Sequence, residues 1–287
     1  HDALTSITPT ATVLMSAIGT SNVDNTYFEW TETDLAAVNS SNRVLEGEAS
    51  PGNDTATLGV RKGGYTQLSD KVVEITSTQS AVDSVGKEGR MAKQMAYKLL
   101  ELRKDMETMM LDNVAANAGA TGTARVTAGL PAYLTSNVSR GTGGANGTTS
   151  GSGSSGHVNA AATDASDGNK RAITETLLKG VIADCWTAGA EPSIVLCGPS
   201  QKQTISAFTG NATRFKEAED SKINAAIDVY ISDFGELQIV PTRLQRARDV
   251  FVLDPNFAEV VYLQTAKQDA LAKTGHSERR LVSVEYG

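Results

Sequence analysis

Apolar side chains recur at spacings of three and four between residues 86 and 117, the pattern of a single buried face on one long helix. The apolar positions of this face are Met91, Met95, Leu99, Leu102, Met106, Met109 and Leu111. The stretch contains no proline, and at its full length the helix would span roughly 45 Å. We therefore expect a scaffold helix that several other elements share.

Charged residues cover the rest of this helix. Lys98 lies three residues before Glu101, and Arg103 lies four residues before Glu107. Side chains at these spacings meet on the surface of a helix, where each pair contributes about 0.2–0.5 kcal/mol. We expect both pairs to be exposed and the helix to be held by the packing of its apolar face.

Residues 43–82, which precede the helix, have the pattern of a hairpin that turns at Gly63-Gly64, with Lys62 beside a polar, basic tip. The apolar residues of its two strands are Leu58, Val60, Tyr65, Leu68, Val72, Val73 and Ile75. A two-stranded ribbon is marginal in water. We therefore expect it to rest on its own sheet or on a neighbouring molecule, which makes it a candidate assembly arm.

Residues 1–42 carry apolar side chains without a clean period, and Tyr27, Phe28 and Trp30 follow one another in strand-like order. This segment indicates an extended arm. Three aromatic residues with no partner strand nearby in sequence would expose apolar surface unless the arm lies on another domain or subunit. The alternative is an ordinary leading strand of the core. Because the sequence starts at His1, we expect preceding residues to be removed or to lie outside it.

Glycine, serine, threonine, alanine and asparagine dominate residues 139–170, which favours a solvent-exposed inserted loop that cannot bury enough surface to order itself. Gly151, Gly153 and Gly156 have the spacing of a dinucleotide-binding fingerprint. No strand is predicted before them and no helix after them, although both are needed to cradle a phosphate. We therefore expect no cofactor here.

The remainder of the chain alternates short helices and strands, which predicts an α+β body. The predicted elements are helices at 172–188 and 199–209, a buried strand at 193–197, a hairpin at 229–240 turning at Phe234-Gly235, a strand pair at 250–253 and 260–263 joined by a turn at 254–256, and a final strand at 279–286.

Composition narrows the class of protein. The chain has 287 residues, 40% of them hydrophobic, which is enough for one large core or two modest ones. A net charge of −7 argues against general nucleic-acid binding, and no apolar run is long enough to cross a membrane. Arg243, Arg246 and Arg248 cluster without an acid among them, which favours a solvated or interface loop over a phosphate site. Cys185 and Cys197 give no disulfide framework, as is typical of a reducing cytoplasm.

The sequence offers few candidates for catalytic or ligand-binding residues. His1, His157 and His276 stand far apart, so no metal-ligand spacing and no catalytic triad can be proposed. The positions of the aspartate and glutamate residues are more typical of solvated surfaces than of catalytic acid–base pairs. We expect no catalytic, cofactor-binding or metal-binding residues, and a structural protein rather than an enzyme, with an unrecognised hydrolase as the remaining enzymatic alternative.

Several segments have a familiar sequence. They are residues 7–9, 14, 18–19, 26–31 (TYFEWT), 35–37, 43–44, 65–67 and 101–107 (ELRKDME). In these segments the chain resembles the tailed-phage major capsid proteins of the coliphage SU-ten-like group. The resemblance follows most of the chain in order and is specific in its first 117 residues. It implies the Hong Kong ninety-seven phage fold, which has an N-terminal arm, an E-loop hairpin, a long spine helix, a P domain and an A domain.

Carried over by position, the resemblance implies a division of the chain into six parts. They are the N-terminal arm at 1–42, the E-loop at 43–82, the spine helix with the first part of the P domain at 83–138, the Gly/Ser-rich insertion at 139–171, the A domain at 172–235 and the return to the P domain at 236–287.

The implied function is self-assembly into the icosahedral shell of a tailed bacteriophage that encloses double-stranded DNA. The implied partners are further copies of the chain in hexamers and pentamers, together with portal, scaffolding and cement proteins. Contact with packaged DNA would be non-specific, and no membrane is involved. The protein would be located in the virion capsid after assembly in the host cytoplasm. An encapsulin-like shell, which encloses protein instead of DNA, is the alternative.

The resemblance also suggests which side chains make assembly contacts. The apolar anchors of the arm would be Tyr27, Phe28 and Trp30, and the contacts at the E-loop tip would be Arg61, Lys62 and Tyr65. Replacing Trp30 with alanine should cost a few kcal/mol if it is buried between subunits. Some relatives form a lysine-to-asparagine isopeptide bond, for which Lys62 or Lys71 lies in the right element, although lysines in hairpins are usually solvated.

Overall fold

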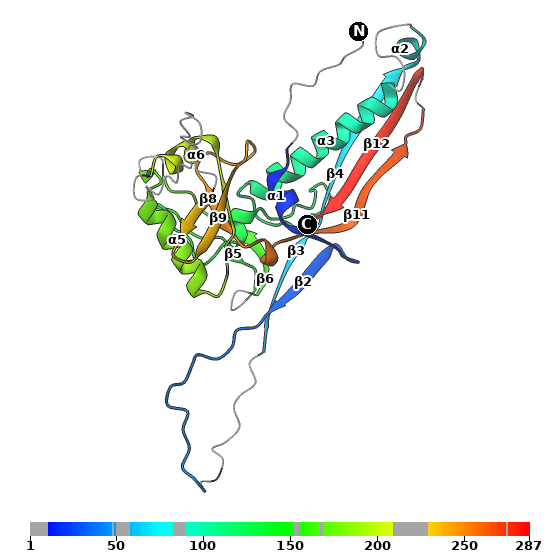
Figure 1. Cartoon of the computed structure of the whole chain (residues 1–287). Helices are drawn as coiled ribbons and strands as arrows, with labels where there is room; N and C mark the ends of the chain where they lie inside the picture. Colours follow the sequence, from blue (N-terminus) through cyan, green and yellow to red (C-terminus); the bar gives the residue numbers. More distant parts are fainter. Residues whose placement is uncertain are drawn as a thin grey trace.

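The computed structural model describes residues 11–47, 49, 58–82, 90–151, 155–166, 169–208, 229–273 and 275–287. Figure 1 shows a long helix, α3, lying along an elongated sheet, with a smaller α/β unit beside one end and a long loop projecting from the other side. The helices are α1 (Val13–Ala17), α2 (Ser77–Ala81), α3 (Arg90–Leu111), α4 (Leu130–Tyr133), α5 (Glu175–Thr187), α6 (Pro199–Ser206) and the 3-10 helix η3 (Pro255–Phe257).

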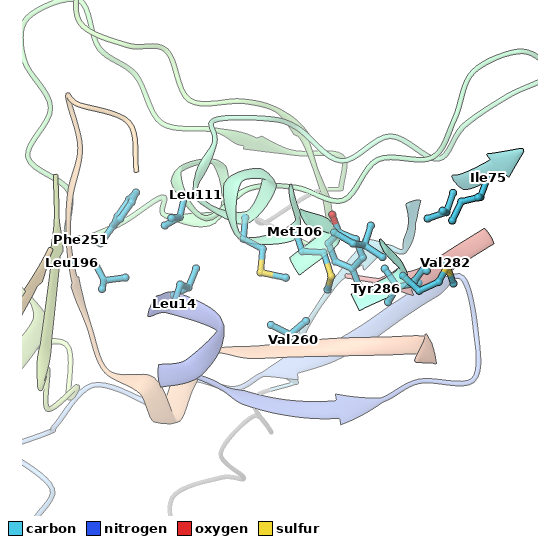
Figure 2. Close-up of a cluster of buried hydrophobic side chains, with 14 residues drawn as sticks. Leu14, Ile75, Met106, Leu111, Leu196, Phe251, Val260, Val282 and Tyr286 are labelled. Carbon is cyan, nitrogen blue, oxygen red and sulfur yellow. The ribbon is translucent and has the colours of Figure 1, made fainter. Parts of the chain in front are cut away.

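The first sheet supports α3. Its strand order is β1 (Gly19–Asn22), β11 (Glu259–Ala270), β12 (Ser277–Tyr286) and β4 (Gln67–Thr76). β1 runs parallel to β11, and the other neighbours are antiparallel. Figure 2 shows Met106 of α3 and Tyr286 and Val282 of β12 in one apolar cluster, which Leu14 of α1 joins. The predicted final strand is confirmed as β12.

The helix α3 confirms the predicted scaffold but ends earlier than expected. It stops at Leu111 instead of residue 117, so the described helix spans about 33 Å; residue 86 lies outside the described residues. Beyond Leu111 the chain bonds to other segments: the Ala116 N–H donates to the Val158 carbonyl oxygen at 2.9 Å, and Asn113 accepts the Ala162 N–H at 3.0 Å. These long-range bonds replace the helical ones and end the helix.

The buried face of α3 includes Met95, Leu102, Met106 and Leu111 as predicted, and also Met110. The predicted Lys98–Glu101 ion pair is present at 2.7 Å. The predicted exposed pair of Arg103 and Glu107 is wrong. Glu107 is fully buried and bonds to α1, while Arg103 donates to the Thr12 hydroxyl oxygen at 3.2 Å.

The second sheet forms the α/β unit. Its order is β10 (Val250–Leu253), β7 (Ile194–Cys197), β9 (Gly235–Pro241) and β8 (Val229–Ser232). α5 and α6 contribute Leu178, Ile182 and Ile205 to its own apolar cluster, while Leu196 and Phe251 join the cluster of the first sheet. The two sheets therefore share a buried boundary.

The helices, the buried strand and the hairpin predicted after residue 172 are all present in the second unit, with the hairpin turn at residues 233–234. The predicted pairing of strands 250–253 and 260–263 is wrong. β10 pairs with β7, whereas β11 pairs with β1 and β12. The turn at 254–256 carries the chain from one sheet to the other. Asp254 caps η3 within this turn by accepting the Asn256 N–H at 3.0 Å.

The third sheet has the order β2 (Tyr27–Glu32), β3 (Val60–Tyr65), β6 (Gly156–Ala160) and β5 (Thr148–Thr149). The predicted hairpin turn at Gly63-Gly64 is wrong, because both glycines lie inside β3, opposite Glu29 and Phe28 of β2. β3 gives way to β4 at the buried Thr66, and the two strands pair in different sheets.

The glycine-rich segment is ordered in its described part, contrary to expectation. β6 pairs with both β3 and β5 and buries Val158. The segment is held by its strand pairs and by Val158, which packs in a small apolar cluster with Ala116, Ala128 and Ala132. Gly156 begins a strand instead of preceding a helix, which is the wrong context for a dinucleotide fingerprint, and Gly153 lies outside the described residues.

Candidate assembly surface at the base of the long loop

A long loop joins β2 to β3. The two strands are antiparallel, with Tyr27 opposite Tyr65 and Glu32 opposite Val60. The loop therefore begins and ends at neighbouring positions on the body, at Glu32 and Val60. Figure 1 shows the described part of this loop extending far from the body. Its apolar side chains face solvent: Leu35 is 93% exposed, Val38 99% and Leu58 87%. None of the residues that the structure describes covers this apolar surface.

Aromatic side chains gather at the base of the loop. The Tyr27 and Tyr65 rings lie 4.9 Å apart between centroids, and His157 of β6 packs edge-on at 4.9 Å from Tyr65. Trp30 stacks on Phe28 at 6.1 Å and lies 6.1 Å from Tyr133. The arm therefore finds its partners within the same chain, on β3, β6 and α4.

Trp30 keeps 37% of its surface exposed, and both Tyr27 and Phe28 are half-buried. Burial raises the pKa of the Tyr27 hydroxyl, and burial raises that of Tyr133 to about 12. The predicted aromatic anchors are thus partly packed within the chain and partly exposed.

Charged side chains flank the aromatic residues. The Lys62 ammonium lies 2.6 Å from a Glu32 carboxylate oxygen, and the Trp30 indole N–H donates to Glu32 at 2.9 Å. Burial alone would raise the pKa of Glu32, but hydrogen bonds from Lys62 and Trp30 outweigh it and lower the pKa. Arg61 pairs with Glu29 across the two strands. These residues do not lie at the tip of a hairpin as predicted, but at the root of the long loop.

The two lysines considered for crosslinking both face carboxylates of the same chain. Lys62 pairs with Glu32, and Lys71 lies 2.5 Å from Asp105 of α3. The hydrogen bond with Asp105 raises the pKa of Lys71. Both lysines therefore act as ion-pair donors within the single chain.

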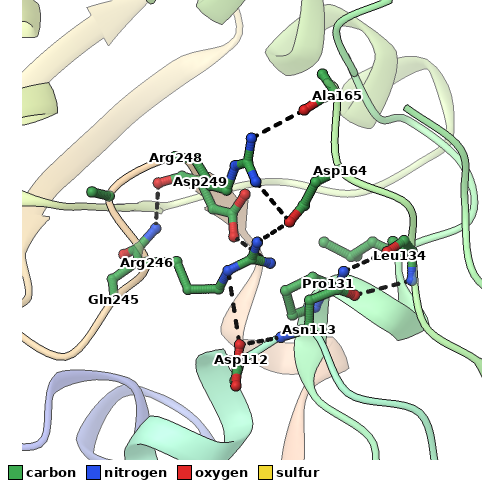
Figure 3. Close-up of polar contacts among 12 residues, drawn as sticks. Asp112, Asn113, Pro131, Leu134, Asp164, Ala165, Gln245, Arg246, Arg248 and Asp249 are labelled. Carbon is green, nitrogen blue, oxygen red and sulfur yellow. Dashed lines mark hydrogen bonds and ion pairs between the residues drawn. The ribbon is translucent and has the colours of Figure 1, made fainter. Parts of the chain in front are cut away.

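A second polar cluster joins the end of α3, the glycine-rich segment and the loop before β10, as Figure 3 shows. Arg246 pairs with Asp164, lies 3.2 Å from Asp249 and contacts Asp112 at 3.8 Å. Arg248 pairs with Asp164 at 2.9 Å. Arg248 is exposed, as predicted for a solvated loop, whereas Arg246 is partly buried among acids that the local sequence pattern did not indicate.

Across the described residues, no three of the histidine, cysteine, aspartate and glutamate side chains come together to hold a metal ion. No helix in the described ranges is long and apolar enough to span a membrane. Cys185 and Cys197 are free thiols.

Sequence reasoning missed three residues that shape these sites. Tyr133 completes the aromatic group, Asp164 holds two arginines, and Glu107 anchors α1. Each acts on a segment distant in sequence. The only local signal was at Glu107, which lies on the same helical face as Met106 and Met110 but was assigned by its charge to the surface.

Comparison with known proteins gives a consistent result. The sequence model of the SU10 major capsid protein family matches residues 1–287. The major capsid protein of Escherichia phage Phieco32 is 27% identical over 109 residues, which are 38% of this chain. The matched part spans only 31% of that relative's length.

Solved structures with the same fold come from phage capsids. The cyanophage A-1(L) capsid asymmetric unit is similar with a TM-score of 0.65 at 11% identity, covering 100% of this chain and 91% of that one. The capsid structure of cyanophage P-SCSP1u has a TM-score of 0.60 at 12% identity, with 99% and 86% covered. A structure of the phage G major capsid and decoration proteins has a TM-score of 0.55 at 8% identity, with 100% and 88% covered. At these identities the likeness shows a shared fold.

Proposed function

This chain belongs to the SU10 major capsid protein family, whose model matches residues 1–287, and on that premise we propose that its long loop binds a neighbouring copy to build a closed icosahedral shell. The predicted identity as a tailed-phage major capsid protein is confirmed, as is the predicted α+β fold of the Hong Kong ninety-seven type. It is a structural protein of the virion capsid and not an enzyme.

The exposed apolar residues of the long loop carry this proposal. Leu35, Val38 and Leu58 are almost fully exposed in the single chain. Apolar side chains on an extended loop are stabilised only when another surface covers them. A neighbouring subunit supplies that surface, and repetition of the same contact by symmetry closes the shell. Many modest contacts of this kind give the whole shell a stability that none has alone.

The six side chains at the base of the loop are proposed to extend this contact. They are Tyr27, Phe28, Trp30, Arg61, Lys62 and Tyr65. Their aromatic faces and ion pairs hold β2 against β3, so the loop leaves the body in one fixed direction. The free face of Trp30, 37% exposed, is the part available to a second subunit.

The six-part division of the chain is retained as a proposal with two revisions, one to the E-loop predicted at 43–82 and one to the A domain predicted at 172–235. The projecting loop begins after β2 at Glu32 and returns at Val60, so we place the E-loop between these residues instead of at 43–82. β4 then belongs with the spine and the P domain, because it pairs with β12 along its full length and packs on α3. The A domain is the unit built on β7, β8, β9 and β10.

The partners proposed for the shell are hexamers and pentamers of this chain, with portal, scaffolding and cement proteins. Two similar structures contain further proteins besides the shell protein, which supports the scaffolding and cement partners. One is the satellite phage P4 procapsid with its size-determination protein, and the other is the phage G shell with its decoration proteins. Assembly takes place in the host cytoplasm, and contact with DNA is non-specific. The net charge of −7 supports this, because it repels the DNA backbone.

Electron microscopy of the purified chain, paired with light scattering for particle mass, tests the proposal. Closed shells, or free hexamers and pentamers, are expected. A uniform monomer at every salt and protein concentration would overturn it. Nuclease treatment and gel analysis of shells recovered from the host then separate a DNA-containing virion from an encapsulin-like compartment, which would contain protein.

A further inference from the structure

Glu107 is fully buried in the contact between α3 and α1. Its two carboxylate oxygens accept the backbone N–H groups of Leu14 and Met15, each at 2.9 Å. These amides belong to the first turn of α1, where helical amides have no partner inside their own helix. Glu107 therefore caps a helix that lies more than 90 residues earlier in the chain.

α1 has no cap of its own. Thr12 occupies the N-cap position, but its side chain makes no capping hydrogen bond. Its hydroxyl oxygen instead accepts a hydrogen bond from Arg103 at 3.2 Å, one turn before Glu107 on α3. Leu14 adds an apolar contact, since it is buried in the main cluster (Figure 2). Three kinds of contact thus fasten one turn of chain to α3.

A buried carboxylate makes this attachment specific. A buried charge is costly unless its hydrogen bonds are made, so Glu107 is satisfied only when α1 presents both amides in one position. An apolar contact alone would tolerate sliding of the short helix along α3. The attachment also fixes the position of the next strand, because β1 begins at Gly19, two residues after α1 ends, and pairs with β11 in a set register.

We propose that Glu107 is a positioning residue, which sets the point and direction at which the N-terminal arm leaves the body. The inference rests on the proposed function, in which the long loop and the side chains at its base meet a neighbouring subunit. With the anchor in place, every subunit presents its arm in the same geometry, as a closed symmetric shell requires. Without it, α1 detaches while the sheets and the α/β unit stay folded.

The test compares Glu107→Gln with Glu101→Gln in the full chain. Glutamine keeps the size of Glu107 but places an NH₂ group against one of the two amides, so one hydrogen bond is lost and a donor faces a donor. Glu101 lies on the same helix and pairs with Lys98 near the surface, which makes it the matched control. Hydrogen exchange is measured at residues 12–18 and in β12, and particle yield is measured by light scattering.

In Glu107→Gln we expect the amides of Leu14 and Met15 to exchange at least tenfold faster, with exchange in β12 unchanged, and the yield of shells to fall at least tenfold. Glu101→Gln should match the original chain in both measurements. Unchanged exchange at residues 12–18, or a normal yield of shells, would overturn the inference. Equal acceleration in β12 would also overturn it, because that result indicates a general loss of stability.

If Glu107→Gln fails to fold, Arg103→Gln replaces it in the hydrogen-exchange test. It removes the partly buried hydrogen bond to Thr12 and leaves Glu107 in place, and we expect a smaller, two- to fivefold acceleration confined to residues 12–18. No acceleration there would count against the anchor. Failure of the original chain to form shells under any condition would refute the proposed function, but would leave the exchange result for α1 standing.

Discussion

Gly63 and Gly64 lie next to each other in β3 and leave room for the aromatic side chains of β2. A Cβ atom at Gly63 would lie 2.6 Å from the Tyr27 hydroxyl oxygen and 2.7 Å from the Phe28 carbonyl oxygen. A Cβ at Gly64 would lie 2.6 Å from the Phe28 ring. Contacts this short force the strands or rings to move, so both glycines are required by packing and not by a turn.

Gly63→Ala should therefore destabilise the chain by about 1–3 kcal/mol, since the added methyl group meets backbone as well as side chain. Gly180→Ala is the control, because a Cβ there meets nothing within 4 Å and Gly180 lies inside α5. That substitution should stabilise the chain by about 0.5–1 kcal/mol. Denaturant unfolding of both variants checks the pair. An equal effect of the two substitutions would contradict the packing argument.

Ionisation of the buried Tyr286 hydroxyl lowers the stability of the folded chain at alkaline pH. Burial raises the pKa of its hydroxyl to about 12, above the usual value near 10. The folded chain therefore keeps a proton that the unfolded chain loses, and the resulting stability is fully present below about pH 10 and lost as the pH rises towards 12. The free energy of unfolding should fall in this window, and Tyr286→Phe should reduce the fall by about 2–3 kcal/mol. Identical profiles for the two proteins would contradict this.

Sequence patterns identified the aromatic residues of β2 but not their surroundings. Tyr27, Phe28 and Trp30 stand out because aromatic residues crowded on a strand need cover. The residues that cover them, Tyr133 and His157, lie more than 100 positions away, and no periodicity connects them. Glu107 was misplaced for a related reason: charge normally indicates exposure, and only the amides of α1 make its burial favourable.

Elements were predicted better than the pairing between them. The helices α3, α5 and α6 and the strands β7, β10 and β12 follow from local periodicity and turn residues. Which strand lies beside which depends on contacts far apart in sequence, so the β10–β7 pair and the parallel β3–β6 pair were missed. The glycine-rich segment was misjudged for the same reason, because its order comes from the strands on which it lies.

Arg246 holds the junction between these elements. It contacts Asp112 after α3, Asp164 in the glycine-rich segment and Asp249 before β10. Arg246→Gln leaves three carboxylates near one another without this cation, and we expect a loss of roughly 1–3 kcal/mol in the free energy of unfolding. Denaturant unfolding measures the loss.

Arg280→Gln is the matched control for Arg246→Gln. Arg280 pairs with Glu278 on the surface, where both side chains are about half exposed, and such pairs contribute about 0–1 kcal/mol. A loss at Arg280 as large as that at Arg246 would mean that the junction contributes no more than an ordinary surface pair.

The whole molecule combines a well-packed body with a projecting loop whose described apolar side chains are mostly exposed. The body has three sheets, and its two largest apolar clusters meet at Leu196 and Phe251. The loop between β2 and β3 holds exposed apolar side chains and contributes no described contact to these clusters. Stability of the body and assembly of the shell should therefore depend on different residues.

Replacing residues 35–57 with a short Gly/Ser linker tests this separation most directly. Glu32 and Val60 are opposite each other in the ladder, so a short linker can close β2 onto β3. Light scattering with electron microscopy measures particle mass, and denaturant unfolding measures the stability of the body. We expect the shortened chain to unfold at the same denaturant concentration as the intact chain but to remain monomeric where the intact chain forms shells. Shells of normal mass and yield from the shortened chain would contradict the central claim that this loop joins the subunits.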